Sequence, residues 1–339
     1  EIRLSLVGSE MCIRDRYGKG ASWGDNAVLY RMNAQSHQIE QAFKRNGIPY
    51  KIFGGTGFFD RAEIKDMLAY LCVIASPDDD LRLGRIINNP PRGIGAKSIE
   101  TAAAIAHENN CSLFSVISKA DLYPDLSRAA PRMLLFAGMI NELMAQKDEL
   151  APDLLYDQLV ERTGYLRMLE EKHTVEDDAR AQNIKELKSS IINYKGETDN
   201  PTLEGYLADV ALYTDMDNYD DSADCVVMMT MHSAKGLEFP NVFVVGCEEG
   251  IFPGIKAIGE ADEMEEERRL CYVAITRAKK RLFLSCARQR MLFGRTTANR
   301  VSRFIDEIPE EHLEKRNIPR GYGLSLIHIS EPTRLRRIS

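Results

Sequence analysis

The residues best suited to chemistry lie in two short segments in the last third of the chain. Residues 231–246, MHSAKGLEFPNVFVVG, have the pattern of a strand end, a loop with Lys235, Gly236 and Glu238, and a second strand. The sequence EEERRLCYVAITRAKKRLFL then predicts a charged helix that runs into Arg277, followed by another strand. A guanidinium that reaches a γ-phosphate from across a cleft stabilises the charge of phosphoryl transfer. The two segments therefore indicate one wall of a nucleotide site.

The rest of such a site is absent from this sequence. A phosphate-cradling loop needs a GxxxxGK[ST] run, and a metal-bound water needs a DExx strand; neither occurs in the 339 residues. No second His, Cys or carboxylate lies at ligand spacing from His232, so we expect no metal site held by this chain. The seven cysteines have no CxxC spacing and are typical of reduced thiols.

The elements that would position these residues change character along the chain. AVLY (residues 27–30), a helical pattern and IPYKIF suit a parallel strand–helix–strand unit. A long helical stretch follows, and strand patterns return in CVVMMTM, NVFVVG and RLFLSCA. We therefore predict an α/β fold in which a parallel-sheet domain is interrupted by an all-helical inserted domain.

Composition limits the kind of partner. The formal charge of −7 gives no overall attraction to nucleic acid, so any such binding must come from local basic or backbone-lined surfaces. No apolar run approaches the length of a membrane span, and the N-terminus has no signal-peptide pattern. We expect a cytoplasmic protein with no membrane partner.

The two ends of the chain encode each other's antisense strand. Back-translation of residues 7–16, VGSEMCIRDR, can give a sequence whose reverse complement encodes LSLIHISEP, residues 324–332. Native termini have no reason to be related in this way, and the pattern resembles translated sequencing-library adapter. We therefore expect residues 1–16 and most of 321–339 to be non-native, which would make the natural part a fragment.

Five motifs, taken in order, resemble one family. LYRMNAQS, FFDRAEIKDMLAYL, PPRGIG, MHSAKGLEFP and EEERRLCYVAITRA are similar to the UvrD/PcrA branch of superfamily-one DNA helicases, over essentially all of residues 17–320. The resemblance implies a RecA-like domain (2A) formed by residues 17–56 and 223–320. It also implies that residues 57–222 are the helical domain 2B inserted in it.

The resemblance further implies what the protein does. The chain would be part of an ATP-dependent 3′–5′ DNA helicase or translocase of DNA repair and replication. The full-length protein would use ATP and Mg²⁺, whereas this fragment alone would hold neither and be inactive. Its partners would be single-stranded DNA, a duplex junction and the missing N-terminal RecA-like domain. Two alternatives stay open, a DNA-binding module without a motor and a subunit of a RecB/AddA-type helicase–nuclease.

For the nucleotide site, the resemblance implies three residues. Arg277 would be the catalytic arginine that senses the γ-phosphate, Glu238 would accept from a ribose hydroxyl, and Gly236 would let the backbone approach the ligand. The alternatives are a surface arginine in a salt bridge and a solvated loop glutamate.

For DNA, the resemblance implies contacts from both domains. The tracked strand would be held by phosphate contacts and by an aromatic ring that stacks on a base, and the duplex would be gripped by the PPRGIGAK turn. The residues are Arg31, Asn33, His232 and Phe293, with Arg92, Gly93, Gly95 and Lys97 in the turn. The alternatives are local pairing of Arg31 with a helix N-cap at Asn33, a structural histidine, a core phenylalanine and an ordinary Gly-x-Gly turn.

Overall fold

The chain divides into two compact units, one formed by residues 1–58 and 216–339 and the other by residues 59–215. The computed structural model describes residues 13–14, 17–18, 20, 22–215, 224–317 and 324–330.

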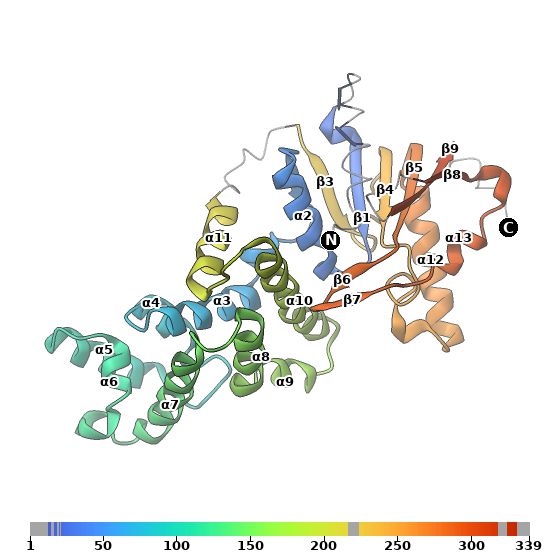
Figure 1. The fold of residues 1–339 in the computed structure, drawn as a ribbon. Coiled ribbons are helices and arrows are strands. Elements are labelled where there is room, and N and C mark those ends of the chain that lie inside the picture. Colours follow the sequence, from blue (N-terminus) through green and yellow to red (C-terminus); the bar gives the residue numbers. More distant parts are fainter. Residues whose placement is uncertain are drawn as a thin grey trace. The chain divides into compact units, whose positions relative to one another are not determined.

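The first unit is built on a twisted sheet (Figure 1). Its strands have the order β2-β3-β1-β4-β5-β9-β8. Strands β1 to β5 pair with one another in parallel, whereas β9 is antiparallel to β5 and β8. The prediction of an α/β fold with a parallel sheet is confirmed. The strands are β1 (Asn26–Tyr30), β2 (Tyr50–Ile52), β3 (Val226–Thr230), β4 (Phe239–Val245), β5 (Ala278–Ala287), β8 (Glu314–Asn317) and β9 (Leu324–Ser330).

Helices cover both faces of the sheet, which explains why its strands are nearly continuous apolar runs. Alternate residues of β1 point to opposite faces. Val28 packs with Phe43 of α2 (Ser36–Arg45) in one core cluster. Leu29 belongs to the other cluster, with residues of α12 (Ala261–Thr276) and α13 (Arg303–Asp306). The parallel sheet is therefore the middle layer of this unit.

Shorter elements complete the first unit. A hairpin of β6 (Arg290–Leu292) and β7 (Arg295–Thr297) follows β5. The 3₁₀ turns are η1 (Trp23–Asp25), η2 (Asn33–Gln35), η3 (Phe58–Asp60, which runs into the second unit), η6 (Ile255–Ala257) and η7 (Glu310–His312).

The second unit, all of whose residues 59–215 are described, is helical throughout. Its α-helices are α3 (Ala62–Ala75), α4 (Asp80–Ile86), α5 (Ala96–Glu108), α6 (Leu113–Ile117), α7 (Ala130–Gln146), α8 (Pro152–Thr163), α9 (Tyr165–Glu170), α10 (Val175–Glu197) and α11 (Leu203–Asp215). Two 3₁₀ turns, η4 (Ala120–Leu122) and η5 (Pro124–Leu126), precede α7.

A buried carboxylate holds this helical unit together. Asp66 of α3 accepts from Arg85 Nε of α4 at 2.6 Å and from the Tyr165 hydroxyl of α9 at 2.6 Å. Asn89 Nδ2 donates to the same carboxylate at 2.5 Å. Burial, followed by the bond to Asp66, raises the pKa of Tyr165, so its hydroxyl stays a donor. A buried charge with this many donors is satisfied and fixes the helices it joins.

Part of the sequence attributed to adapter forms a strand. Residues 324–330 pair antiparallel with β5 and with β8. The pairing does not bear on the origin of these residues, because an alternating apolar segment can pair with any open strand edge. Except for residues 13–14, the rest of the two expected non-native segments lies outside the described residues.

None of the helices in the described ranges is both long enough and apolar enough to cross a membrane.

Candidate functional site

Arg277 lies where α12 meets β5, and its guanidinium is held by neighbouring oxygens. Its Nε donates to the Val273 carbonyl at 2.9 Å, and one terminal nitrogen donates to the Leu237 carbonyl at 2.9 Å. The other terminal nitrogen donates to the Thr276 hydroxyl at 3.0 Å. Arginine has five N–H donors, so within the described part of the chain each terminal nitrogen keeps one more. The half-buried side chain is thus fixed with donors to spare.

The loop before β4 is tied to Arg277 in return. The Phe239 N–H donates to the Arg277 carbonyl at 2.9 Å, so backbone and side chain of this arginine both hold the loop. Gly236 has a φ of +90° and no atom of the described structure lies within 4 Å of where its Cβ would be. The left-handed φ and the open space suit a glycine that leaves room for a ligand.

Glu238 follows in the same loop with an exposed carboxylate. Lys279 Nζ lies 3.8 Å from it, and both side chains are about half exposed, at 54% for Lys279 and 43% for Glu238. An exposed pair at this distance is weak. The structure therefore brings Gly236, Glu238 and Arg277 together at the amino ends of β4 and β5.

Arg31 and His232 lie at the other edge of the sheet, after the carboxyl ends of β1 and β3. Arg31 Nε and one terminal nitrogen donate to Glu267 Oε1 of α12 at 2.8 and 2.6 Å. The Glu267 side chain is only 7% exposed, and the Gly254 N–H also donates to it, at 3.2 Å. Arg31 is therefore in an ion pair in this structure, and its contact with DNA stays a prediction.

The His232 side chain is exposed, but its surroundings disfavour the protonated imidazole. Partial desolvation, followed by the positive charge of Arg31, lowers the pKa of His232, and Glu267 and Glu266 oppose this shift. His232 is thus predominantly neutral at pH 7 and would contact DNA as a hydrogen-bonding group rather than as a cation.

The start of the next helix differs from the N-cap that the sequence suggested. Asn33 is the exposed first residue of η2, and Met32, not Asn33, occupies the cap position. The side chain of buried Gln35 does the capping, because its Oε1 accepts from the N–H groups of Arg31 and Met32 at 3.0 and 2.9 Å. Gln35 is three residues after the cap position, where a glutamine often accepts from the backbone N–H of the cap residue. The sequence therefore contained a signal for this capping interaction that was missed.

Phe293 lies at the tip of the β6–β7 hairpin. Leu292 pairs with Arg295, so the loop consists of Phe293 and Gly294, whose φ angles are +54° and +72°. A two-residue loop with both φ angles positive is a type I′ turn, which favours Asn and Gly. A half-buried phenylalanine in this position is strained by about 1–2 kcal/mol, which is unusual for a residue that only fills space.

The helical unit presents the predicted glycine turn, but one of its two cations is engaged. Arg92 donates to the Ile86 carbonyl at 3.0 Å and to the Tyr70 hydroxyl at 2.6 Å, and its guanidinium lies 5.0 Å from the Phe136 ring centre. Arg92 therefore stabilises the turn from within. Gly95, the N-cap residue of α5, and Lys97 are exposed.

Gly93, between Arg92 and Gly95, has a left-handed φ of +70°. Its carbonyl accepts from Arg132 at 3.3 Å, which adds a third cation to this turn. The sequence did not indicate that Arg132 belongs to this turn, because Arg132 lies on α7, 39 residues further along the chain.

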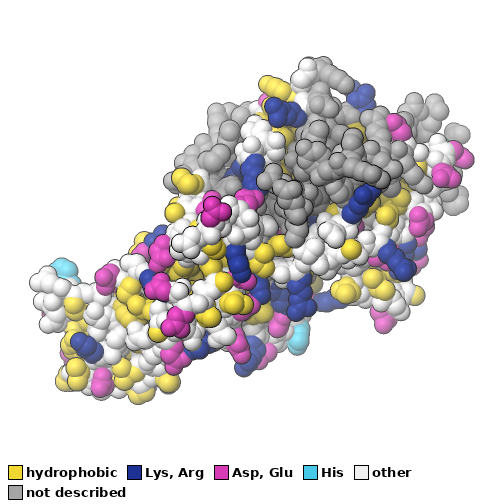
Figure 2. All heavy atoms as spheres, viewed as in Figure 1, with side chains coloured by type: hydrophobic (Ala, Val, Ile, Leu, Met, Phe, Trp, Pro, Cys, Tyr) yellow, Lys and Arg dark blue, Asp and Glu magenta, His cyan; other side chains and the backbone are white. Residues whose placement is uncertain are grey.

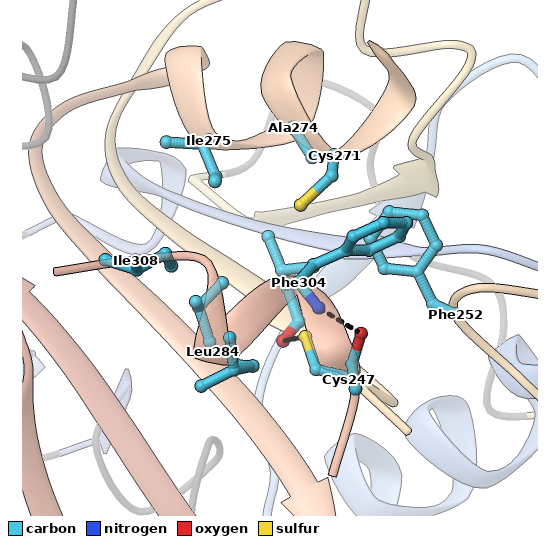
Figure 3. Close-up of a pocket in the computed structure, with 11 residues that line it drawn as sticks. Cys247, Phe252, Cys271, Ala274, Ile275, Leu284, Phe304 and Ile308 are labelled. Carbon is cyan, nitrogen blue, oxygen red and sulfur yellow. Dashed lines mark hydrogen bonds between the residues drawn. The ribbon is translucent and has the colours of Figure 1, made fainter. Parts of the chain in front are cut away.

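A small apolar cavity lies under α12 (Figure 3). Cys271, Ala274 and Ile275 of α12 face Phe252 and Phe304 across it, and Ser302 N donates to the Cys247 carbonyl at its base, at 2.9 Å. Burial raises the pKa of the Cys271 thiol to about 12, which disfavours the nucleophilic thiolate. The cavity is part of the packing that places α12. In the described ranges, no group of three or more His, Cys, Asp or Glu side chains could hold a metal ion.

The first unit is thus an α/β domain whose parallel sheet lies between two layers of helices. An arginine at the end of α12 is joined to the loop before β4, and polar residues follow the carboxyl ends of β1 and β3. The model of the UvrD-like helicase C-terminal domain matches residues 10–289, and the chain belongs to this family.

Among individual proteins, the chain is similar to three relatives named ATP-dependent DNA helicase PcrA. It is 44% identical to the protein of Bacillus subtilis over 299 residues, which is 86% of this chain and 40% of the relative. It is 43% identical to the protein of Staphylococcus aureus over 302 residues, 88% of this chain and 41% of the relative. For the protein of Staphylococcus epidermidis the identity is 43% over 312 residues, 91% of this chain and 42% of the relative. The chain thus spans about two fifths of the length of these relatives.

Proposed function

We propose that this chain supplies one wall of the ATP site and part of the DNA track of an ATP-dependent 3′–5′ DNA helicase of repair and replication. The observation that carries the proposal is the position of Arg277. Its side chain is held at three points, by the oxygens of Val273, Leu237 and Thr276, and keeps further N–H donors. A guanidinium fixed in this way needs little reorganisation to meet a phosphate.

In this proposal the nucleotide lies against the amino edge of β4 and β5. Arg277 stabilises the charge on the γ-phosphate, Glu238 accepts from a ribose hydroxyl, and Gly236 leaves space for the backbone to approach. These residues fit a nucleoside triphosphate, since the fixed guanidinium of Arg277 can donate to a phosphate and the exposed carboxylate of Glu238 can accept from a hydroxyl. The phosphate-cradling loop and the ligands of Mg²⁺ would come from an N-terminal RecA-like domain, so the 339-residue chain alone would hydrolyse no ATP.

The DNA track would follow the opposite edge and the hairpin. Arg31, Asn33 and His232 would contact phosphates, and Phe293 would stack on a base without sequence preference. Lys97, with the N–H groups around Gly93 and Gly95, would contact duplex phosphate, while Arg92 supports that turn. On the face shown in Figure 2, cationic and anionic side chains are interspersed over the described atoms. This suits local contacts rather than a broad basic surface.

The PcrA relatives favour a motor protein of the PcrA type over a RecB/AddA-type subunit. The matched segments cover 86% and 88% of this chain and so include the loop of Glu238 and the helix of Arg277, which a DNA-binding module without a motor would not require.

The test is Arg277→Ala in the full-length protein that contains this chain. We expect the DNA-stimulated rate of ATP hydrolysis to fall by about 10³–10⁵-fold, the range for loss of an arginine finger, with little change in single-stranded DNA binding. Arg277→Lys should rescue little of this activity, because an ammonium does not reproduce the planar fork.

Arg269→Ala is the matched control. Arg269 lies on the same helix, is 74% exposed and pairs only with exposed Glu266 within the described structure. Its removal should leave the rate of ATP hydrolysis unchanged. A full rate in Arg277→Ala, or DNA-stimulated hydrolysis by the 339-residue chain alone, would contradict the proposal.

A further inference from the structure

We propose that a buried ion pair, Glu248 with Arg290, positions the β6–β7 hairpin and so holds the Phe293 ring in place to meet a base. The inference about the anchor stands on the geometry below, and its consequence for DNA rests on the function proposed above. Glu248 and Arg290 are thus positioning residues that act through Phe293.

The two side chains form one of the most buried ion pairs of the described structure, with 1% of Glu248 and 4% of Arg290 exposed. Arg290 donates to Glu248 Oε1 at 2.7 Å and to Oε2 at 3.3 Å. The Ala287 N–H donates to Oε1 at 2.8 Å, and Asn299 Nδ2 donates to Oε2 at 3.3 Å. The carboxylate is therefore fully used within the unit.

These contacts hold the residues before β6 and after β7, at both ends of the hairpin. Glu248 follows β4, Ala287 ends β5, Arg290 begins β6 and Asn299 follows β7. One carboxylate therefore joins the two stems of the hairpin to the ends of two sheet strands. Gln38 of α2 adds a bond to the Met291 carbonyl, and the Glu249 N–H donates to the Arg300 carbonyl at 2.9 Å.

Two costly features on one short element indicate a function. A buried ion pair is a poor source of stability, because well-packed apolar residues often do as well, but it can fix one geometry. The hairpin tip carries a phenylalanine at a φ of +54°, where Asn or Gly would fit without strain. Holding an aromatic side chain still before it binds reduces the entropy lost on binding. The anchor and the strained tip together make a preformed stacking platform.

The test compares Glu248→Gln/Arg290→Met with Glu249→Gln in the 339-residue chain. The double variant keeps an amide acceptor for the Ala287 N–H and removes the buried cation together with the carboxylate that neutralises it, so it should fold. Glu249→Gln is the matched control, because this neighbouring carboxylate pairs with Arg303, whose side chain is 45% exposed.

The first measurement is amide hydrogen exchange over residues 288–299. We expect exchange to be at least about tenfold faster in the double variant and unchanged in Glu249→Gln. Unchanged hairpin exchange in a folded double variant would overturn the inference. If the double variant fails to fold, Asn299→Ala, which removes only the 3.3 Å contact, should still accelerate exchange in this hairpin more than elsewhere, and no such acceleration would overturn it.

The second measurement uses an oligothymidylate that contains one 2-aminopurine, whose fluorescence responds to stacking. We expect the double variant and Phe293→Leu to lose the fluorescence change and to bind about five- to a hundredfold more weakly. The salt dependence of binding should stay that of the unchanged chain, because no phosphate contact is removed.

The two measurements separate the two ideas. If the unchanged chain gives no fluorescence response and Phe293→Leu binds normally, the proposed role of Phe293 in DNA binding fails, and hydrogen exchange alone decides whether the pair anchors the hairpin. If exchange is faster in the double variant but the stacking signal persists, the pair does not position Phe293 and the inference is overturned.

Discussion

At the scale of single residues, the two key arginines are held in different ways. Arg277 is held by two carbonyls and a hydroxyl, which are neutral acceptors, so its positive charge is not cancelled. Arg31 is paired with a buried carboxylate at 2.6 Å, which largely neutralises it. A phosphate would therefore meet a cation at Arg277, whereas at Arg31 it would have to compete with Glu267.

The charges around His232 lead to a prediction about pH. Its pKa is lowered, so between the folded value and the unfolded value of about 6.5 the folded state binds fewer protons than the unfolded state. The stability contributed by neutral His232 is complete above the unfolded pKa and is lost as the pH falls through the window below it. NMR titration of the His232 ring should show the lowered pKa.

Two variants of one ion pair should move that pKa in opposite directions. Arg31→Met removes the positive charge and should raise the pKa of His232, whereas Glu267→Gln removes the negative charge and should lower it further. Equal titration curves in both variants would show that neither charge acts on the imidazole.

At the scale of elements, α12 connects the two edges of the sheet. Glu267 in its middle holds Arg31 at the carboxyl edge, and Arg277 follows its last turn at the amino edge. The ten residue steps from Glu267 to Arg277 correspond to about 15 Å along the helix. A rigid helix that carries both contacts gives the proposed nucleotide and DNA sites a common element.

The turn after β4 gives a prediction for a glycine. Gly246 has a φ of +76°, and a Cβ on it would lie 2.4 Å from Nε2 of buried Gln35. Gly246→Ala should therefore lower the free energy of unfolding by about 2–4 kcal/mol, through backbone strain and the displacement of Gln35. Urea unfolding followed by circular dichroism measures the change.

Gly138→Ala is the matched control for that prediction. Gly138 lies inside α7, and no atom of the described structure lies within 4 Å of where its Cβ would be. Alanine there should raise the stability by about 0.5–1 kcal/mol, since helical glycine loses more backbone entropy. A Gly246→Ala variant as stable as the unchanged chain would show that the turn accepts a side chain.

At the scale of the whole molecule, the helical unit is one unbroken stretch with a core of its own. Tyr70, Tyr156, Tyr165 and Tyr206 are fully buried in it, and Asp66 joins three of its helices. We expect residues 59–215, expressed alone, to unfold cooperatively in urea, with near-ultraviolet circular dichroism from the ordered tyrosines. A helical but non-cooperative state without that signal would show that the unit depends on the rest of the chain.

Much of the fold was predictable because its signals are local. The apolar runs around β1, β3, β4 and β5 indicated buried parallel strands, and the charged helix ending at Arg277 has the predicted form. The alternative of a helix N-cap at Asn33 was wrong, because Met32 occupies the cap position and Gln35 folds back to accept from the N–H groups of Arg31 and Met32. Local propensity does not show such a side-chain contact.

The candidate site was predictable only as a set of residue types. The α/β class, the family motifs and the residues able to contact a phosphate or a base follow from residue identity and from spacing along the chain. The pairing of Arg31 with Glu267, the inward position of Arg92 and the contact of Glu248 with the hairpin of Phe293 became visible only in the folded chain. Hydrogen bonds and ion pairs depend on distance in space, and these partners are brought together by the packing of elements that are separate in the sequence.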